Sequence, residues 1–277
     1  MPPVTDVLKA LESDFSERSY EDKFVSQDDV RFVQLLCGTI RQREDGHYEM
    51  PLPFKDNNPP ALPNNNRLAT IRLEHLKKKL KIHTQYFDHY KAFMEETISK
   101  GDAEPAPVSS EGDIVWYIPY CSLLTGPDLT NSLVGVLCRF RKEAVAVTCD
   151  IQKMFHQSSV SPEFRNYLRF LWWEGGQLDT EPKEYRMAVH LFGAGSSPGC
   201  ANFALKYLAQ QHKVDYPAAS AFIENNFYVD DGLTSVSSVE EAQNVIVEAQ
   251  ELCKSGGLHL FNLYTSSTQI KVTCSHV

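Results

Sequence analysis

The sequence predicts an α+β fold in which an antiparallel sheet is covered by helices on one face. Short β-rich runs in the second half of the chain end at aspartates, one run at Asp150 and one hairpin around Asp230. Before and between these runs, apolar residues recur at steps of three to four, which is typical of amphipathic helices. Helices that alternate with hairpin strands in this way are typical of α+β folds.

Composition places the chain among ordinary globular proteins. Its 277 residues are 42% hydrophobic and 23% charged, so it can bury a core as one large or two small domains. No run of 18 apolar residues and no signal-peptide pattern is present, and we therefore expect no membrane association and a cytoplasmic location. The net charge of −9 is unusual for a protein that binds nucleic acid, so such binding would depend on local basic patches.

The histidines and cysteines predict no zinc site. The seven cysteines are odd in number and show no Cys-x-x-Cys spacing, and the nine histidines form no cluster with ligand spacing. This pattern favours reduced thiols in an intracellular setting.

Residues 1–66 are expected to form an irregular N-terminal connector or arm. One helix is predicted there, with Ser26 near its cap, from the apolar positions Val30, Val33, Leu36, Cys37 and Ile40. Residues 51–66 hold five prolines and five asparagines, a composition that favours a linker or extended arm over a packed element.

Residues 67–142 form a predicted helical region. Helical spacing begins at Arg67 and includes Leu68, Ile71, Leu76, Leu80, Phe87, Tyr90 and Met94. The cluster at 77–79 and Lys81 has two interpretations, a solvated helix face or a face that contacts phosphates. We expect a loop over residues 101–112 and a second helix over 128–140.

Residues 143–260 alternate between predicted strands and helices. Strands are expected over 144–150, 167–173 and 185–191, the last two flanking a polar turn at 174–176. Pro198 suits the first turn of a helix that runs to about Gln210. Residues 238–241 have a capping-box pattern that opens another helix, which ends at Gly256 and Gly257.

Three aspartates are the candidate chemical groups. Residues 226–229 and 233–236 predict a hairpin whose tight turn carries Asp230 and Asp231. The simpler interpretation is a solvated turn, because Asp and Gly are ordinary turn residues. Asp150, 80 residues before Asp230, ends another strand. Three carboxylates at one sheet edge favour a two-metal phosphoryl-transfer site.

Several longer blocks of sequence resemble one family. The blocks are residues 46–54, 149–157, 167–173 and 190–202, followed by Tyr-Val-Asp-Asp at 228–231. Together they resemble the reverse transcriptase of BEL/Pao-type LTR retrotransposons, over roughly residues 10 to 260. The hairpin tetrad alone is a weak motif, whereas several blocks in the same order are a strong one.

The resemblance implies a polymerase fingers/palm-like fold. The 46 residues after Asp231 are too few for a thumb or a ribonuclease H domain, so neither is expected in this chain. Residues 67–142 would be a truncated fingers-like region, 143–260 the palm and 261–277 a divergent tail. The implied activity is RNA-directed DNA synthesis, the two-metal transfer of deoxynucleotides to a primer 3′-hydroxyl. The implied partners are an RNA or DNA template-primer, deoxynucleotide triphosphates, and other pol-derived chains or domains.

The resemblance also assigns the metal site. Asp150, Asp230 and Asp231 would be catalytic and would hold Mg²⁺, with Mn²⁺ as an alternative. The backbone carbonyl of Ile151 would supply a further ligand oxygen, since hard cations accept carbonyl ligands.

The remaining site residues would contact nucleotide and primer. Phe155 would lie under the sugar and exclude a ribose 2′-hydroxyl, and Phe192, Gly193 and Ala194 would lie near the nascent base pair. Tyr228 would support the primer terminus. Without the resemblance, Phe155 would be expected as a core aromatic residue and Tyr228 as a buried hairpin tyrosine.

The sequence also departs from the family. Only residues 121–125 lie between the blocks at 117–120 and 126–131, where the family pattern has a longer fingers segment with Lys and Arg that bind the triphosphate. The chain then diverges after residue 260. Two alternatives therefore stand beside the polymerase: a catalytically inactive retrotransposon-derived fragment that acts at most as a binding module, and a metal-dependent phosphohydrolase that uses the same carboxylates.

Overall fold

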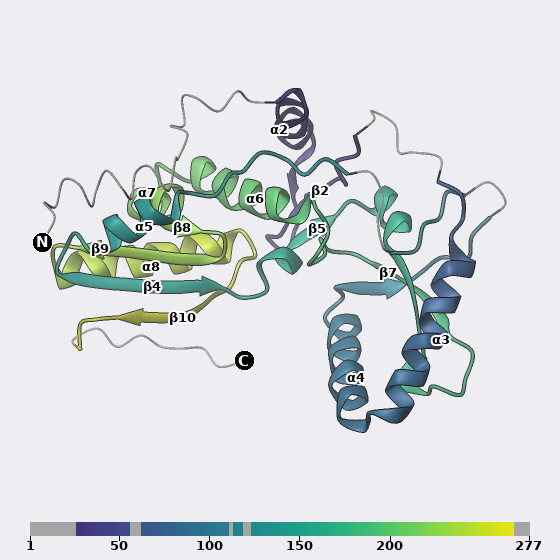
Figure 1. Ribbon diagram of the computed structural model, residues 1–277. Helices are drawn as coiled ribbons and strands as arrows, with labels where there is room; N and C mark the ends of the chain where they lie inside the picture. Colours follow the sequence, from purple (N-terminus) through teal and green to yellow (C-terminus); the bar gives the residue numbers. More distant parts are fainter. Residues whose placement is uncertain (1–25, 56–61, 111–112, 119–122, 269–277) are drawn as a thin grey trace, which may run out of the picture.

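The computed structural model describes residues 26–55, 62–110, 113–118 and 123–268. The chain forms a mixed fold of helices and three small sheets (Figure 1). The strand orders are β10-β4-β9-β8, β1-β2-β5 and β3-β7-β6. All strand pairs are antiparallel except β2 with β5. The predicted mixture of helices with antiparallel sheet is therefore present.

The four-stranded sheet positions the three aspartates. It consists of β4 (Val145–Ile151), β8 (Phe227–Tyr228), β9 (Asp231–Val236) and β10 (Leu260–Thr265). Along β4, Val147, Cys149 and Ile151 are buried whereas Thr148 and Asp150 are partly exposed. This alternation gives the sheet one core face and one open face, because successive side chains in a strand point to opposite sides.

Helices cover the core face of this sheet. They are α6 (Ser197–Gln211), α7 (Pro217–Asn226) and α8 (Val239–Ser255), which share one apolar core with the strands; in Figure 1, α6 and α7 lie above the sheet and α8 overlaps β9. Their largest fully buried side chains include Leu205, Leu208, Ile223 and Leu252. The predicted starts of two helices are confirmed: Pro198 lies in the first turn of α6, and the Ser238 hydroxyl accepts a hydrogen bond from the backbone N–H of Glu241.

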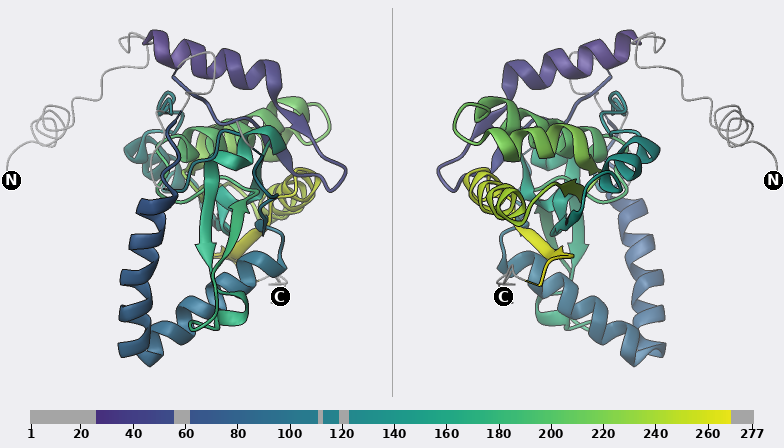
Figure 2. Two further views of the ribbon diagram at one scale, coloured as in Figure 1. Left: turned by 90° about the vertical axis from the view of Figure 1, so that its right-hand side faces the viewer. Right: turned by 90° about the vertical axis from the view of Figure 1, so that its left-hand side faces the viewer.

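A second, helical lobe is built on the sheet β3-β7-β6. Its strands are β3 (Ala103–Pro105), β7 (Lys183–Met187) and β6 (Arg169–Trp172). Helices α3 (Asn66–Ile82) and α4 (Thr84–Ser99) pack against this sheet around Trp172 and Trp173. The predicted helical region after Arg67 is thus two helices, which meet at an elbow at His83 (Figures 1 and 2).

The N-terminal part of the described chain packs against both lobes. Helix α2 (Gln27–Thr39) lies across α6 (Figure 2) and buries Phe32 and Leu36. The prediction of a Ser26 cap is confirmed by a capping box with Asp29. Strands β1 (Arg41–Gln42) and β2 (Tyr48–Met50) follow, and β2 pairs with β5 (Ser158–Val160).

The prediction of an unpacked arm after residue 51 is wrong at its start. Leu52 and Phe54 are buried in the middle of the molecule, where Phe54 packs against Tyr167. Residues 56–61, which carry two of the prolines, lie outside the described residues. The composition of this segment, rich in proline and asparagine, does not register the apolar residues between the prolines.

Other elements differ from expectation at their ends. Helix α5 (Leu133–Phe140) begins five residues later than predicted, because the Ser132 hydroxyl accepts from the backbone N–H of Gly135 and caps it there. Strand β3 lies within the predicted loop 101–112, and β7 ends at Met187 rather than at residue 191. Strand β10 crosses the predicted boundary at residue 260 and closes one edge of the four-stranded sheet. Three 3₁₀ helices complete the described chain: Met154–Gln157 (η1), Pro162–Leu168 (η2) and Glu174–Gly176 (η3).

Two expectations from composition can be compared with this fold. None of the helices in the described ranges is both long and apolar enough to span a membrane. The five cysteines in those ranges, Cys37, Cys138, Cys149, Cys200 and Cys253, are all free thiols.

Candidate functional site

The structure brings the three predicted aspartates to one end of the four-stranded sheet. Asp150 in β4 lies directly opposite Asp231 in β9. Asp230 lies in the turn between β8 and β9, and its carbonyl oxygen accepts a hydrogen bond of 3.0 Å from the backbone N–H of Ile151. Directly opposite residues in an antiparallel pair point to the same face, so the side chains of Asp150 and Asp231 share the open face of the sheet.

The turn that carries Asp230 is tight and depends on its neighbours. Val229 has a φ of 57°, a left-handed conformation that is uncommon for a β-branched residue. A Cβ atom at Gly232 would lie 2.7 Å from the Cys149 sulfur and 2.7 Å from the ring of Phe227. Gly232 therefore allows the hairpin to lie close against the core, and this fixes the position of the aspartates before it.

Among the described residues, no basic side chain forms an ion pair with an aspartate of this cluster, so its negative charge is not neutralised there. Burial raises the pKa of Asp150, and the carboxylates of Asp230 and Asp231 raise that pKa further. Burial and the charge of Asp230 likewise raise the pKa of Asp231. Within the described part of the chain, the buried Oδ1 of Asp150 has no hydrogen-bond partner. An unpaired buried oxygen beside two further carboxylates fits the donor chemistry of a hard divalent cation.

The carboxylates share a sheet end without forming a ready set of ligands. Among the residues that the structure describes, no group of three or more His, Cys, Asp and Glu side chains is arranged to hold a metal ion. A cation would therefore have to draw these side chains together. The side chain of Ile151 is fully buried and has no donor atom, so only the backbone carbonyl oxygen of this residue is suited to a metal.

The two predicted nucleotide-contacting phenylalanines contact each other. Phe155 lies in η1, which follows β4, and its ring centroid is 5.5 Å from that of Phe192. The side chain of Phe192 is 83% exposed. It is followed by Gly193, whose φ of +88° favours glycine, and by Ala194, whose N–H donates to the Leu191 carbonyl. The structure thus joins two sequence blocks, 149–157 and 190–202, in one aromatic pair.

Tyr228 also lies on the open face. It is opposite Asp231 in the pairing of β8 with β9 and is partly exposed, so the alternative of a buried hairpin tyrosine does not describe it.

Two aromatic residues of the open face were missed by the sequence analysis. Phe261 lies opposite Asp150 and Tyr264 opposite Thr148 in the pairing of β10 with β4. Tyr264 is 62% exposed. The available signal was the apolar and aromatic run after Gly257, which is typical of a strand.

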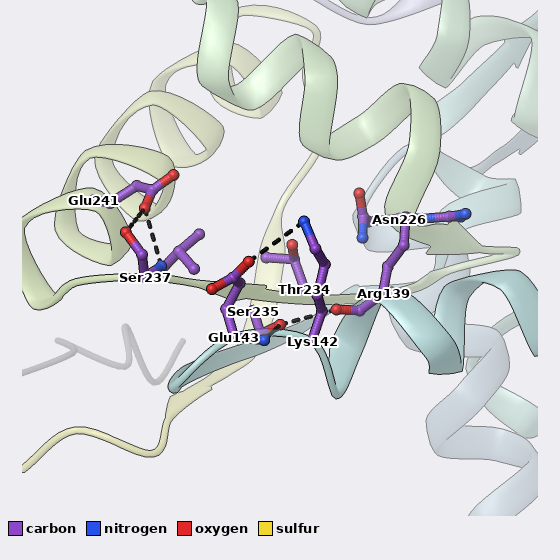
Figure 3. A pocket seen from close by; sticks show the side chains of 9 residues that line it. Arg139, Lys142, Glu143, Asn226, Thr234, Ser235, Ser237 and Glu241 are labelled. Carbon is purple, nitrogen blue, oxygen red and sulfur yellow. Dashed lines mark hydrogen bonds and ion pairs between the residues drawn. The ribbon is translucent and has the colours of Figure 1, made fainter.

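A separate pocket of about 390 Å³ lies at the far end of β9, away from the aspartates (Figure 3). Its polar groups already bind one another. Lys142 pairs with Glu143 at 3.3 Å, and the Glu241 carboxylate accepts hydrogen bonds from the backbone and hydroxyl of Ser237. Few charged groups in this pocket are left to recognise a ligand.

Comparison with known proteins does not identify the chain. No protein-family model matches it, and no curated protein matches it.

Proposed function

We propose that this protein is a reverse transcriptase domain that transfers deoxynucleotides to a primer 3′-hydroxyl on an RNA or DNA template. The observation that carries the proposal is the juxtaposition of Asp150 with Asp231 and the Asp230 turn at one end of the open sheet face. The resemblance of the surrounding sequence blocks to BEL/Pao-type polymerases supports the same activity. The proposal includes an intracellular location and a template-primer as the binding partner.

The aspartates would hold the divalent cations that the reaction requires. When bound, Mg²⁺ or Mn²⁺ would lower the pKa of the attacking hydroxyl and neutralise phosphate charge. Asp150, Asp230 and Asp231 would contribute the anionic oxygens, and the backbone carbonyl of Ile151 would contribute a neutral one. The tight hairpin keeps these oxygens at the sheet end, so the role of the protein is placement and charge stabilisation rather than covalent chemistry.

The aromatic pair would form the wall of the nucleotide site. Phe155 stands five residues after Asp150 and contacts the exposed ring of Phe192. A bulky ring at this point would collide with a ribose 2′-hydroxyl and so favour deoxynucleotides. Gly193 and Ala194 present little side chain, which permits close approach of a base pair to the backbone. Tyr228, on the same face as Asp231, would support the primer end.

The direct test is primer extension on an RNA template with Mg²⁺ and deoxynucleotides. The wild-type chain is expected to extend the primer, and the Asp230→Asn/Asp231→Asn variant is expected to lose at least about a hundredfold in rate, since it removes the charges that hold the cations. Phe155→Ala is expected to keep extension and to incorporate ribonucleotides more readily.

A matched control is Glu240→Gln/Glu241→Gln, which also neutralises two adjacent acids but in the first turn of α8. This control should extend the primer at the wild-type rate. Folded wild-type protein that incorporates no nucleotide, or equal extension by the Asp230→Asn/Asp231→Asn variant, would contradict the proposal.

One observation favours a second candidate, a non-catalytic binding module derived from a retrotransposon. The described residues contain no pre-arranged group of metal ligands. Without metal-binding geometry the carboxylates would not support catalysis, and the protein would keep only a surface for binding. This candidate predicts nucleic-acid binding without extension, and the same assay separates the two. The short segment at 121–125 bears on this choice, but residues 119–122 lie outside the described ranges.

A further inference from the structure

The hairpin that carries Asp230 and Asp231 begins with a strand that pairs weakly. This strand, β8, has only two residues and lies at the edge of the four-stranded sheet. An edge strand leaves some of its backbone groups without a partner in the sheet, and so short a pairing is only marginally stable by itself in water. The position of the hairpin therefore depends on contacts from outside the sheet.

Asn131 makes such a contact with β8. Its side-chain Nδ2 donates a hydrogen bond of 2.8 Å to the carbonyl oxygen of Phe227. Because a backbone carbonyl only accepts hydrogen bonds, the NH2 end of the amide has to face it. Asn131 is partly buried, and Ser132, the N-cap of α5, directly follows it. The start of α5 is thus tied to the first residue of β8.

The other end of α5 binds the second strand of the same hairpin. The Ser235 hydroxyl in β9 donates to the Arg139 carbonyl at 2.8 Å and accepts from the Glu143 N–H at 3.0 Å. These three residues lie together in Figure 3. The Arg139 guanidinium also donates to the Asn225 carbonyl, two residues before β8. The segment 131–143 therefore bridges the hairpin from β8 to β9.

The turn between β8 and β9 has a backbone that needs support on both sides. The φ of 57° at Val229 is unfavourable for a β-branched residue and persists only where the surrounding contacts hold it. On the β4 side, the Ile151 N–H donates to the Asp230 carbonyl at 3.0 Å. On the β8 side, the bond from Asn131 holds the strand that leads into the turn. Loss of one support would let the turn and its aspartates move.

We propose that Asn131 is a positioning residue that sets the affinity of the aspartate site for a divalent cation. The described residues contain no ready set of metal ligands, so a cation has to draw the carboxylates together. This costs less free energy when the hairpin already keeps Asp230 and Asp231 near Asp150. Asn131 acts through the Phe227 carbonyl and does not touch the cation. The inference rests on the proposed function, because it takes these aspartates as the metal ligands.

Amide hydrogen exchange of the full chain in EDTA tests the support of the hairpin without metal. Asn131→Ala should speed exchange at residues 228–232 about threefold to tenfold, which corresponds to the loss of one hydrogen bond. Asn131→Leu, which keeps a side chain of similar size and removes the donor, should have the same effect. Exchange in α4, which belongs to the other lobe, should stay unchanged.

Titration calorimetry with Mg²⁺ tests the consequence for the metal site. Both Asn131 variants should bind Mg²⁺ about threefold to tenfold more weakly than the wild type. At saturating Mg²⁺ they should extend a primer at close to the wild-type rate, since the bound cation then holds the carboxylates. A merely structural role of Asn131 would instead lower the rate at every Mg²⁺ concentration.

The matched control is Asn244→Ala, which removes an exposed amide of α8 that donates to Glu248 at 2.9 Å. It should match the wild type in exchange, in Mg²⁺ affinity and in primer extension. The inference is overturned if the Asn131 variants leave exchange at residues 228–232 or the Mg²⁺ affinity unchanged, or if the control loses as much affinity.

These measurements separate the inference from the proposed function. A wild type that binds Mg²⁺ more tightly than the Asn131 variants but extends no primer would overturn the proposed function alone. A wild type that extends a primer, beside Asn131 variants with unchanged Mg²⁺ affinity, would overturn this inference alone.

Discussion

At the scale of single residues, the candidate site contains electrostatic interactions that destabilise the fold. Asp150 has a buried oxygen without a partner and two carboxylates nearby, and its pKa is raised. A carboxyl whose pKa is higher in the folded than in the unfolded state destabilises the fold when it is ionised. Such local costs are typical of sites that await a ligand.

We therefore expect Asp150→Asn to raise the melting temperature in EDTA at neutral pH. The penalty of the ionised carboxyl is fully present above its folded pKa and disappears below its unfolded pKa of about 3.9. The advantage of the variant should consequently shrink as the pH falls toward about 4. Thermal scans of both proteins across this range provide the measurement, and a variant that melts lower than the wild type at pH 7 would contradict this account.

A second residue-scale feature is the buried guanidinium of Arg169. It is fully buried, and it donates hydrogen bonds to the carboxylate of Glu184 at 2.7 Å and to Asn166. The Tyr117 hydroxyl donates to the same carboxylate at 2.6 Å. The network ties β6 to β7 beneath the helical lobe, and it leaves Arg169 dependent on its single carboxylate partner.

Glu184→Ala should destabilise the helical lobe by about 3 kcal/mol, because it leaves a buried charge unpaired. Glu174→Ala, which removes the partner of Lys183 in an exposed pair, should cost less than about 1 kcal/mol. Urea denaturation followed by tryptophan fluorescence measures both, since Trp172 and Trp173 lie in this lobe. Equal costs for the two variants would show that the Arg169 network is not a stabilising contact.

At the scale of elements, local chemistry explains which predictions succeeded. Ser26 and Ser238 cap their helices as predicted, because a cap needs only residues close by in sequence. The break at His83 was not predictable in this way, since apolar spacing continues through the elbow from Leu80 to Phe87. Only the packing of two helices at an angle on one sheet requires the break.

Glycines provide an element-scale prediction. Gly232→Ala should cost about 1–3 kcal/mol, because the added carbon would press on Cys149 and Phe227 in the core beneath the hairpin. Gly38→Ala, at an open position in α2, should instead stabilise the protein by up to about 1 kcal/mol. Thermal unfolding of the two variants is the measurement, and a Gly232→Ala protein as stable as the wild type would contradict the close packing of the hairpin.

At the scale of the whole molecule, the described chain has three apolar clusters. The largest lies between the four-stranded sheet and its helices, one lies around Phe54 and Tyr167, and one around Trp172 and Trp173. Polar contacts join the segment around η1, which follows Asp150, to the helical lobe. Lys153 pairs with Glu96 of α4 at 2.7 Å, and His156 pairs with Asp102 at 3.0 Å.

The double variant Lys153→Ala/His156→Ala should loosen the connection between the lobes. Each exposed or partly exposed pair is worth at most about 1 kcal/mol, so global stability should change little. Amide hydrogen exchange should become faster at the C-terminal end of α4 and in β3, and should stay unchanged in α8. Faster exchange throughout the molecule, or no change in exchange at α4, would contradict a local role of these two pairs in connecting the lobes.

Acidification should loosen the same connection in the wild type. Hydrogen bonds from Lys153 and Lys100 lower the pKa of Glu96 from 4.5 to about 2. A carboxyl with a lowered folded pKa stabilises the fold above its unfolded pKa, and this contribution is lost as the pH falls from about 4.5 to about 2. Exchange at α4 is the readout, and Glu96→Gln should remove the dependence. A pH dependence that persists in Glu96→Gln would assign it to other groups.

The candidate site itself was only partly predictable from sequence. Strand patterns ending at Asp150 and flanking Asp230 place carboxylates at a sheet end, and this much follows from local signals. Phe261 could not be placed, because its position opposite Asp150 depends on the pairing of two strands across a sequence separation of 111 residues (261 − 150). The contact between Phe155 and Phe192 likewise depends on how the loop before α6 folds back on η1.

The proposed activity requires that Asp150, Asp230 and Asp231 together bind a divalent cation. Titration calorimetry of the full chain with Mg²⁺, and separately with Mn²⁺, measures this binding. We predict saturable binding by the wild type, at least about tenfold weaker binding by Asp230→Asn, and no loss in the Glu240→Gln/Glu241→Gln control. Wild-type protein that binds neither ion, or an Asp230→Asn variant that binds like the wild type, would contradict the account.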